Sequence, residues 1–145
     1  MAPTMRRGTI EDEDWLFELF RSTMQNFIDT AWGWDELLQR EGFVTTLPAK
    51  QFQILEHEGS AIASYHLSDK GDHFILDMIL VVPEVQRRGH GTRMLEQIKA
   101  ISRNENKPVQ LSVLKTNPAV AFHEQAGFRQ IQTDEHSIRM QWSPE

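Results

Sequence analysis

Residues 80–92 read LVVPEVQRRGHGT, and this stretch decides the fold. Its apolar start predicts the end of a β-strand, and Gly89 and Gly91 lie where a turn leads into a helix. A helix N-terminus presents unpaired backbone N–H groups and a dipole equivalent to about half a positive charge, so it attracts phosphate. Glycine lets a pyrophosphate reach these amides because it has no Cβ. The alternative is a plain structural turn, since the stretch has neither the ending of a Walker A loop nor the third glycine of a dinucleotide fingerprint.

Two helices are predicted in the N-terminal third of the chain. Apolar residues recur at three- and four-residue steps from Glu11 to about Phe27, which is typical of an amphipathic helix, and Thr9 is its expected N-cap. A second, short helix is expected from residue 34 or 35 to residue 40, ending at Gly42.

Strand periodicity follows after Pro48. The alternation in residues 52–67 predicts a hairpin, and residues 73–82 predict a third antiparallel strand of the same meander. The remaining chain is expected to form a helix over 89–103, a strand over 109–113, a helix over 118–125 that ends at Gly127, and one or two strands over 128–142. This element order predicts a mixed sheet flanked by helices.

Composition limits the function classes. The chain has 145 residues, a formal charge of −6, 39% hydrophobic and 25% charged residues, so one globular domain over residues 1–145 is expected. The absence of cysteine excludes disulfides and thiol nucleophiles, and no metal site is expected. The chain has no long apolar run, which predicts a cytoplasmic protein without membrane contact. The acidic balance disfavours nucleic-acid binding and is compatible with a cationic small molecule.

Two motifs resemble those of the GNAT (Gcn5-related N-acetyltransferase) superfamily. The first is Gln86-x-x-Gly89-x-Gly91 after a Val-x-Pro strand end. The second is residues 113–128, VLKTNPAVAFHEQAGF, which is similar to the family's Asn-x-Ala … Tyr-Glu-x-x-Gly-Phe segment. The element order also matches the family fold, so the resemblance covers nearly the whole chain.

The resemblance implies a mixed α/β fold and acetyl-CoA as cofactor. The fold would be a mostly antiparallel sheet of six or seven strands, splayed between the fourth and fifth strands and flanked by about four helices. The backbones of Ile79, Leu80 and Val81 would pair with the pantetheine arm. The distal part of the cofactor would lie along Asn117 and Phe122. The amides around the pyrophosphate would come from Arg87, Arg88, Gly89, His90, Gly91 and Thr92, and an arginine side chain would reach the ribose phosphate.

The candidate acid departs from the family pattern. Where the family usually has a tyrosine that protonates the leaving sulfur, this chain has His123. The ordinary pKa of imidazole is near 6.5 against about 10 for phenol. We hypothesise that His123 is the general acid; the alternative is that His123 is a partly exposed helical residue without a role.

The candidate base is Asp77, which the two-residue period places on the same face as Ile79 and Val81. The alternative for Asp77 is a solvated or hydrogen-bonded strand carboxylate without a catalytic role. The alternatives for the base are His66, His73 or a water chain.

The acceptor site is expected near residues 31–36, AWGWDE. Trp32, Trp34 and Glu36 would enclose a cation through ring faces and charge. The alternative is that a tryptophan anchors the core and that Asp35 is an N-cap. In the family, this region commonly overhangs the substrate.

The resulting hypothesis is an acetyl-CoA-dependent N-acetyltransferase that acts on a primary amine of a small molecule or on an exposed amino group. The alternative is an acyl-CoA-binding regulatory domain with little or no turnover. By analogy with the family, a homodimer is one expected state.

Overall fold

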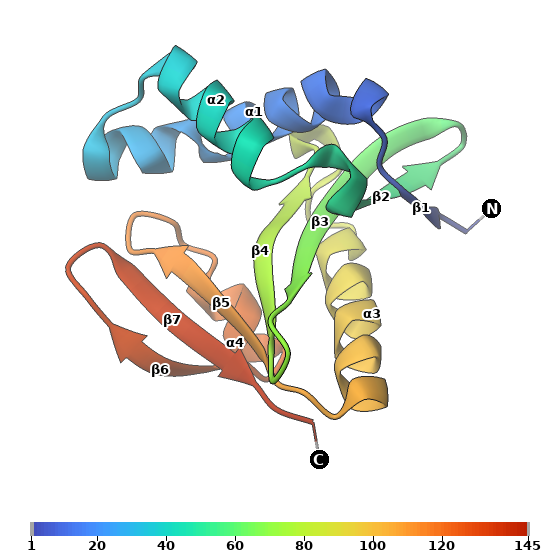
Figure 1. Cartoon of the computed structure of the whole chain (residues 1–145), viewed down its shortest axis with the longest axis vertical. Helices are drawn as coiled ribbons and strands as arrows, with labels where there is room; N and C mark the ends of the chain where they lie inside the picture. Colours follow the sequence, from blue (N-terminus) through green and yellow to red (C-terminus); the bar gives the residue numbers. More distant parts are fainter. Residues whose placement is uncertain (1, 145) are drawn as a thin grey trace.

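A seven-stranded sheet with the order β1-β2-β3-β4-β5-β7-β6 forms the centre of the molecule (Figure 1). This computed structural model describes residues 2–144. Neighbouring strands are antiparallel except for β4 and β5, which are parallel. The expected mixed fold is therefore confirmed. The strands are β1 (Thr4–Arg7), β2 (Phe52–His57), β3 (Ser60–Asp69), β4 (Phe74–Val81), β5 (Val109–Leu114), β6 (Arg129–Thr133) and β7 (Ser137–Trp142).

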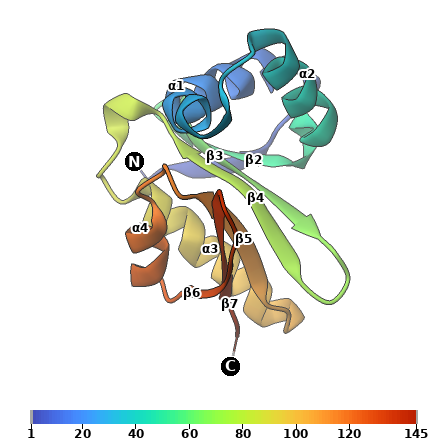
Figure 2. The same ribbon diagram turned by 90° about the vertical axis from the view of Figure 1, so that its left-hand side faces the viewer.

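Four α-helices cover the two faces of the sheet (Figure 2). Helices α1 (Glu13–Trp32) and α2 (Glu36–Thr46) pack on one face, where their apolar residues join Phe52 and Leu80. Helices α3 (His90–Glu105) and α4 (Val120–Gln125) lie on the opposite face. Within residues 2–144, none of the helices has the length and apolar character needed to cross a membrane.

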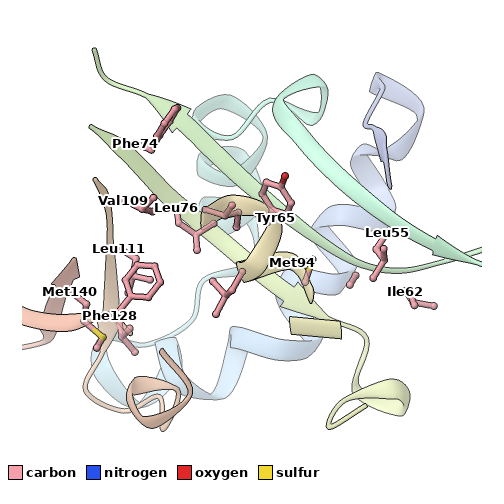
Figure 3. Packing of buried hydrophobic residues seen from close by; sticks show 14 residues of the cluster. Leu55, Ile62, Tyr65, Phe74, Leu76, Met94, Val109, Leu111, Phe128 and Met140 are labelled. Atoms are coloured by element: carbon pink, nitrogen blue, oxygen red, sulfur yellow. The ribbon is translucent and has the colours of Figure 1, made fainter. Parts of the chain in front are cut away.

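The apolar residues between α1, α2 and the sheet form one core cluster, and a second core cluster lies between α3 and the sheet (Figure 3). It joins the β3 and β4 side chains to the C-terminal strands, so it holds both halves of the sheet against one helix. Its central residues Leu95, Ile98 and Val109 are fully buried.

The N-terminal elements differ from the sequence prediction in their bounds. The chain starts with strand β1, and a 3₁₀ turn at Ile10–Asp12 separates Thr9 from α1. Helix α2 does not end at Gly42 but continues to Thr46, because the next residue, Phe43, is buried against the aromatic residues of α1 and β2. Tertiary packing thus overrides the weak helix propensity of glycine.

Strands β4 and β5 meet only at their beginning. They pair at Phe74 with Val109 and at Ile75 with Gln110, and then separate (Figure 1). The rest of β4 has β3 on one side and no strand on the other. This V-shaped opening between β4 and β5 is the splay that the resemblance implies.

A β-bulge at Asp77 changes the phase of β4. His66 pairs with Met78 and Leu67 pairs with Leu76, so Asp77 is the extra residue between them. The bulge turns Asp77 toward His66, on the α1/α2 face of the sheet. The prediction that Asp77 shares a face with Ile79 and Val81 is wrong, because those residues pack in the cluster against α3.

Candidate active site

The turn before α3 leaves several amides of the first helical turn without helical partners. Arg87 and Gly89 have positive φ values of 65° and 86°, which bring the chain sharply into the helix. The Arg93 N–H donates to the Gly89 carbonyl at 2.9 Å and is the first hydrogen bond of α3. The N–H groups of residues 90–92 therefore have no partner within the helix, and Gly89 has no side chain to cap them. Unpaired N–H groups at the N-terminus of a 16-residue helix can bind an anion.

The β4 edge that faces the V-shaped opening carries backbone groups with which no neighbouring strand pairs. The Val82 N–H donates to the Ile62 carbonyl at 2.9 Å, which fixes the alternation of the ladder with β3. Leu80 therefore directs its N–H and C=O toward β3, whereas Ile79 and Val81 direct theirs into the opening. The Gln86 side chain donates to the Val81 carbonyl at 3.0 Å, which ties the turn to this edge. This geometry assigns the open edge to Ile79 and Val81 and corrects the expectation for Leu80.

Phe122 brings the two sequence motifs into contact. A Cβ on Gly91 would lie 2.9 Å from the Cζ of the Phe122 ring, so glycine is needed here for the close approach of α4 to α3. The Asn117 side chain accepts from the Ala119 N–H at 3.0 Å and shapes the loop before α4. Phe122 thus lies against the start of α3, and Asn117 lies in the loop that leads to α4.

His123 is buried rather than partly exposed. Only 4% of its surface is accessible, and its ring packs edge-on against the rings of Phe122 and Phe128. Burial lowers the pKa of His123 from 6.5 to about 4, so the ring is neutral at pH 7. Its Nδ1 is buried and has no hydrogen-bond partner within residues 2–144.

Asp77 lies in a polar cluster on β3 and β4. Its Oδ2 accepts from His66 Nδ1 at 2.7 Å and from Ser68 Oγ at 2.6 Å. Burial acts to raise the pKa of Asp77, but the hydrogen bonds from His66 and Ser68 together outweigh it, and the pKa is lowered. The carboxylate is therefore charged at neutral pH. The other histidine that the sequence suggests as a base, His73, lies in the bend just before β4, and its Nδ1 is 2.6 Å from Asp72 Oδ1.

Positive charge gathers around the start of α3. The pKa of His90 is lowered by partial burial and by the charges of Arg93, His57 and Arg88. These groups act on His90, the first residue of α3, in a chain whose net charge is −6. The local field favours a polyanionic ligand.

Comparison with known proteins identifies the family. The family model described as "Acetyltransferase (GNAT) domain" matches residues 48–130, which is more than half of the chain. The chain belongs to the GNAT acetyltransferase family. GNAT domains use acetyl-CoA. A search of curated protein sequences gives no match.

Solved structures of GNAT proteins share the whole fold. PaiA N-acetyltransferase from Thermoplasma acidophilum, in complex with coenzyme A, has a TM-score of 0.81 at 17% identity, with 99% of both chains covered. The ribosomal-protein-S18-alanine N-acetyltransferase of Escherichia coli has a TM-score of 0.76 at 19% identity, with 98% of this chain and 94% of that chain covered. N-acetylglutamate synthase from Neisseria gonorrhoeae, complexed with coenzyme A and N-acetyl-glutamate, has a TM-score of 0.76 at 17% identity, with 100% of this chain and 36% of that chain covered. At these identities the likeness shows the fold.

The tryptophans of the expected acceptor site have separate contacts in this GNAT domain. The Trp34 ring packs on Phe17 and Phe20, and its Nε1 donates to Glu36 at 3.0 Å. Trp32 is 59% exposed and lies edge-on to His136. These contacts favour the alternative of Trp34 as a core anchor. Asp35 is indeed the N-cap of α2, since its side chain accepts from the Leu38 N–H at 3.0 Å.

The sequence reasoning missed the group that holds Asp77. Ser68 lies in β3 but beyond residues 52–67, over which the alternation predicts the hairpin, and the sequence suggests His66 only as an alternative base. The bulge that brings both side chains to Asp77 leaves no clear sign in the amino-acid pattern. The available signal was the polar alternation of His66 and Ser68 in an otherwise apolar strand.

Proposed function

We propose that residues 1–145 act as an acetyl-CoA-dependent N-acetyltransferase, which transfers an acetyl group to a primary amine of a small molecule or to an exposed amino group. One observation carries this proposal: the open edge of β4 leads directly to the uncapped N-terminus of α3. A strand edge and a helix N-terminus in series match an extended amide-containing arm that ends in a pyrophosphate. The GNAT family membership supports the same function.

The residues of this chain fit coenzyme A by their backbone groups. Ile79 and Val81 would bind the pantetheine amides, and the N–H groups of residues 90–92 would bind the pyrophosphate. Arg87 and Arg88 add positive charge at the same end of the opening. When bound, acetyl-CoA supplies the activated acetyl group. The chain holds it in place, and correct placement alone contributes roughly 7–11 kcal/mol to such reactions.

His123 is proposed to contact the leaving sulfur as a neutral ring. With a pKa of about 4, it is almost wholly uncharged at pH 7 and is a poor proton donor. A neutral imidazole still donates a hydrogen bond through its protonated nitrogen. Its loss is therefore expected to slow acetyl transfer by less than the factor of about 10² to 10⁴ that is typical of a general acid.

The test measures cofactor binding and turnover separately. We expect calorimetry to detect coenzyme A binding and thiol release from acetyl-CoA to depend on an added amine. Gly91→Val is expected to abolish binding, because its side chain displaces the Phe122 ring and crowds the α3 amides. The control Gly42→Ala changes an exposed glycine in α2 with free space around it and is expected to leave binding unchanged. No heat with coenzyme A would contradict the proposal.

The alternative function is an acyl-CoA-binding domain with little turnover. The observation that favours it is the buried, neutral His123 at the position where the family usually has tyrosine. Cofactor binding without thiol release from any amine would support this alternative. If His123→Tyr then restored release, the histidine itself would be the cause of the low turnover.

A further inference from the structure

Asp77 lies at the point where the sheet opens. The last pair between β4 and β5 is Ile75 with Gln110, and Asp77 follows two residues later on the α1/α2 face. Ile79 and Val81, whose backbones face the opening, follow on the same strand. An acidic side chain is thus placed at the closed end of the V-shaped opening.

The carboxylate is held firmly, and part of it remains free. Oδ2 accepts two short hydrogen bonds, from His66 Nδ1 and Ser68 Oγ. The His66 side chain is 1% exposed, and its ring lies edge-on to Phe52 at 4.9 Å, so it cannot turn away easily. No lysine or arginine within residues 2–144 forms an ion pair with Asp77. Its side chain is nevertheless 24% exposed, so the protein does not close the carboxylate off from solvent.

The two donors make Asp77 unsuited to remove a proton from an amine. They stabilise the charged carboxylate, and with a more distant contribution from Lys70 they lower its pKa although it is half-buried. An efficient general base has a pKa near the working pH. A permanently charged, partly desolvated carboxylate without a protein cation is better suited to bind a cation.

We propose that Asp77 anchors a cationic group of the acceptor, that His66 and Ser68 are its positioning residues, and that the acceptor is an amine with a second positive charge. This inference rests on the proposed acetyltransferase function. The neutral amine attacks the thioester carbonyl, the C–N bond forms as the C–S bond breaks, and the proton lost by the nitrogen passes to the leaving thiolate, directly or through solvent. The second ammonium or guanidinium group stays protonated at Asp77. An acceptor with a carboxylate in that place is repelled.

The experiment compares two acceptors of equal length, diaminobutane and n-butylamine, at saturating acetyl-CoA. We expect the wild-type protein to prefer diaminobutane by roughly tenfold in kcat/KM. Asp77→Asn is expected to remove this preference by raising KM for diaminobutane. Ser68→Ala, which removes one of the two hydrogen bonds to Oδ2, should give an intermediate preference. Asp72→Asn removes the same charge from an exposed turn and should leave the preference unchanged.

Three outcomes would overturn the anchor. A wild-type protein that treats both acceptors alike has no cation site. A loss of kcat for both acceptors in Asp77→Asn, together with loss of the acidic limb of the pH profile, makes Asp77 the base. If Asp77→Asn lowers thermal stability but leaves the acceptor preference unchanged, the hydrogen bonds of Asp77 only stabilise the bulge.

If no amine releases thiol, thermal unfolding tests the anchor instead. Stabilisation of the wild type by diaminobutane, without stabilisation of Asp77→Asn, supports the anchor and contradicts only the transferase function. Equal or absent stabilisation of both proteins then overturns the anchor as well.

Discussion

At the scale of single residues, burial changes the chemistry that a residue type suggests. His123 was predicted to be a general acid with an ordinary pKa near 6.5, but burial between Phe122 and Phe128 lowers its pKa to about 4. Asp77 shows the opposite case, because hydrogen bonds outweigh its burial and keep it charged. In both cases the neighbours, and not the ordinary pKa, set the role.

The buried His123 is expected to make the protein sensitive to mild acid. Its pKa is about 4 in the folded chain and 6.5 when unfolded, so between these values the unfolded chain takes up a proton that the folded chain does not. Stability therefore falls as the pH falls, by about 2 kcal/mol from pH 7 to pH 5. Urea unfolding at both pH values measures this loss. From pH 7 to pH 5, the free energy of unfolding of His123→Phe should fall by about 2 kcal/mol less than that of the wild type. An equal fall in both proteins would contradict the assigned pKa. His90, whose pKa is also lowered, contributes to both proteins alike.

At the scale of elements, the function depends on which backbone groups a strand leaves free. β4 uses every second residue for its ladder with β3, and β5 has left its other side after Ile75. The edge of Ile79 and Val81 and the first turn of α3 are therefore parts of one surface. Gln86 joins them by its hydrogen bond to Val81.

Coenzyme A is expected to protect alternate amides of β4 from hydrogen exchange. The amides of Ile79 and Val81 should exchange more slowly when it binds, since they face the opening. The Leu80 amide, which already pairs with β3, should change little. Exchange followed by NMR with and without coenzyme A measures this pattern. Protection of Leu80 without protection of its two neighbours would show that the register assigned to the edge is wrong.

The sequence predicted the elements better than their irregularities. The meander of β2, β3 and β4, the start of α3 at the glycines and the positive φ of Gly127 follow from local patterns and are confirmed. Strand β1 was missed because four residues give too little alternation. The bulge at Asp77 depends on pairing with a distant strand. Local periodicity cannot show such a feature, so the partners of Asp77 were not foreseen.

At the scale of the whole molecule, net charge and local charge have opposite signs. The chain carries −6, which repels an anionic cofactor, but the positive charges of Arg88 and Arg93 act on His90 at the start of α3. The screening length is about 10 Å at 0.1 M salt, so the near groups act more strongly than the distant ones. The local cluster is therefore expected to govern cofactor binding. If affinity falls as salt rises, local attraction dominates; if affinity rises, net repulsion dominates.

Affinity for coenzyme A is expected to fall as salt rises. If the basic cluster governs binding, Kd should increase roughly fivefold between 0.05 and 0.5 M sodium chloride, because screening weakens a local attraction. Arg88→Gln should raise Kd at low salt and reduce this salt dependence. Arg129→Gln, on the edge strand β6 at the other end of the sheet, removes the same charge and should leave both quantities unchanged. Calorimetry at both salt concentrations gives the answer: a Kd that decreases with salt would mean that the net negative charge dominates and that the cluster at α3 does not attract the phosphates.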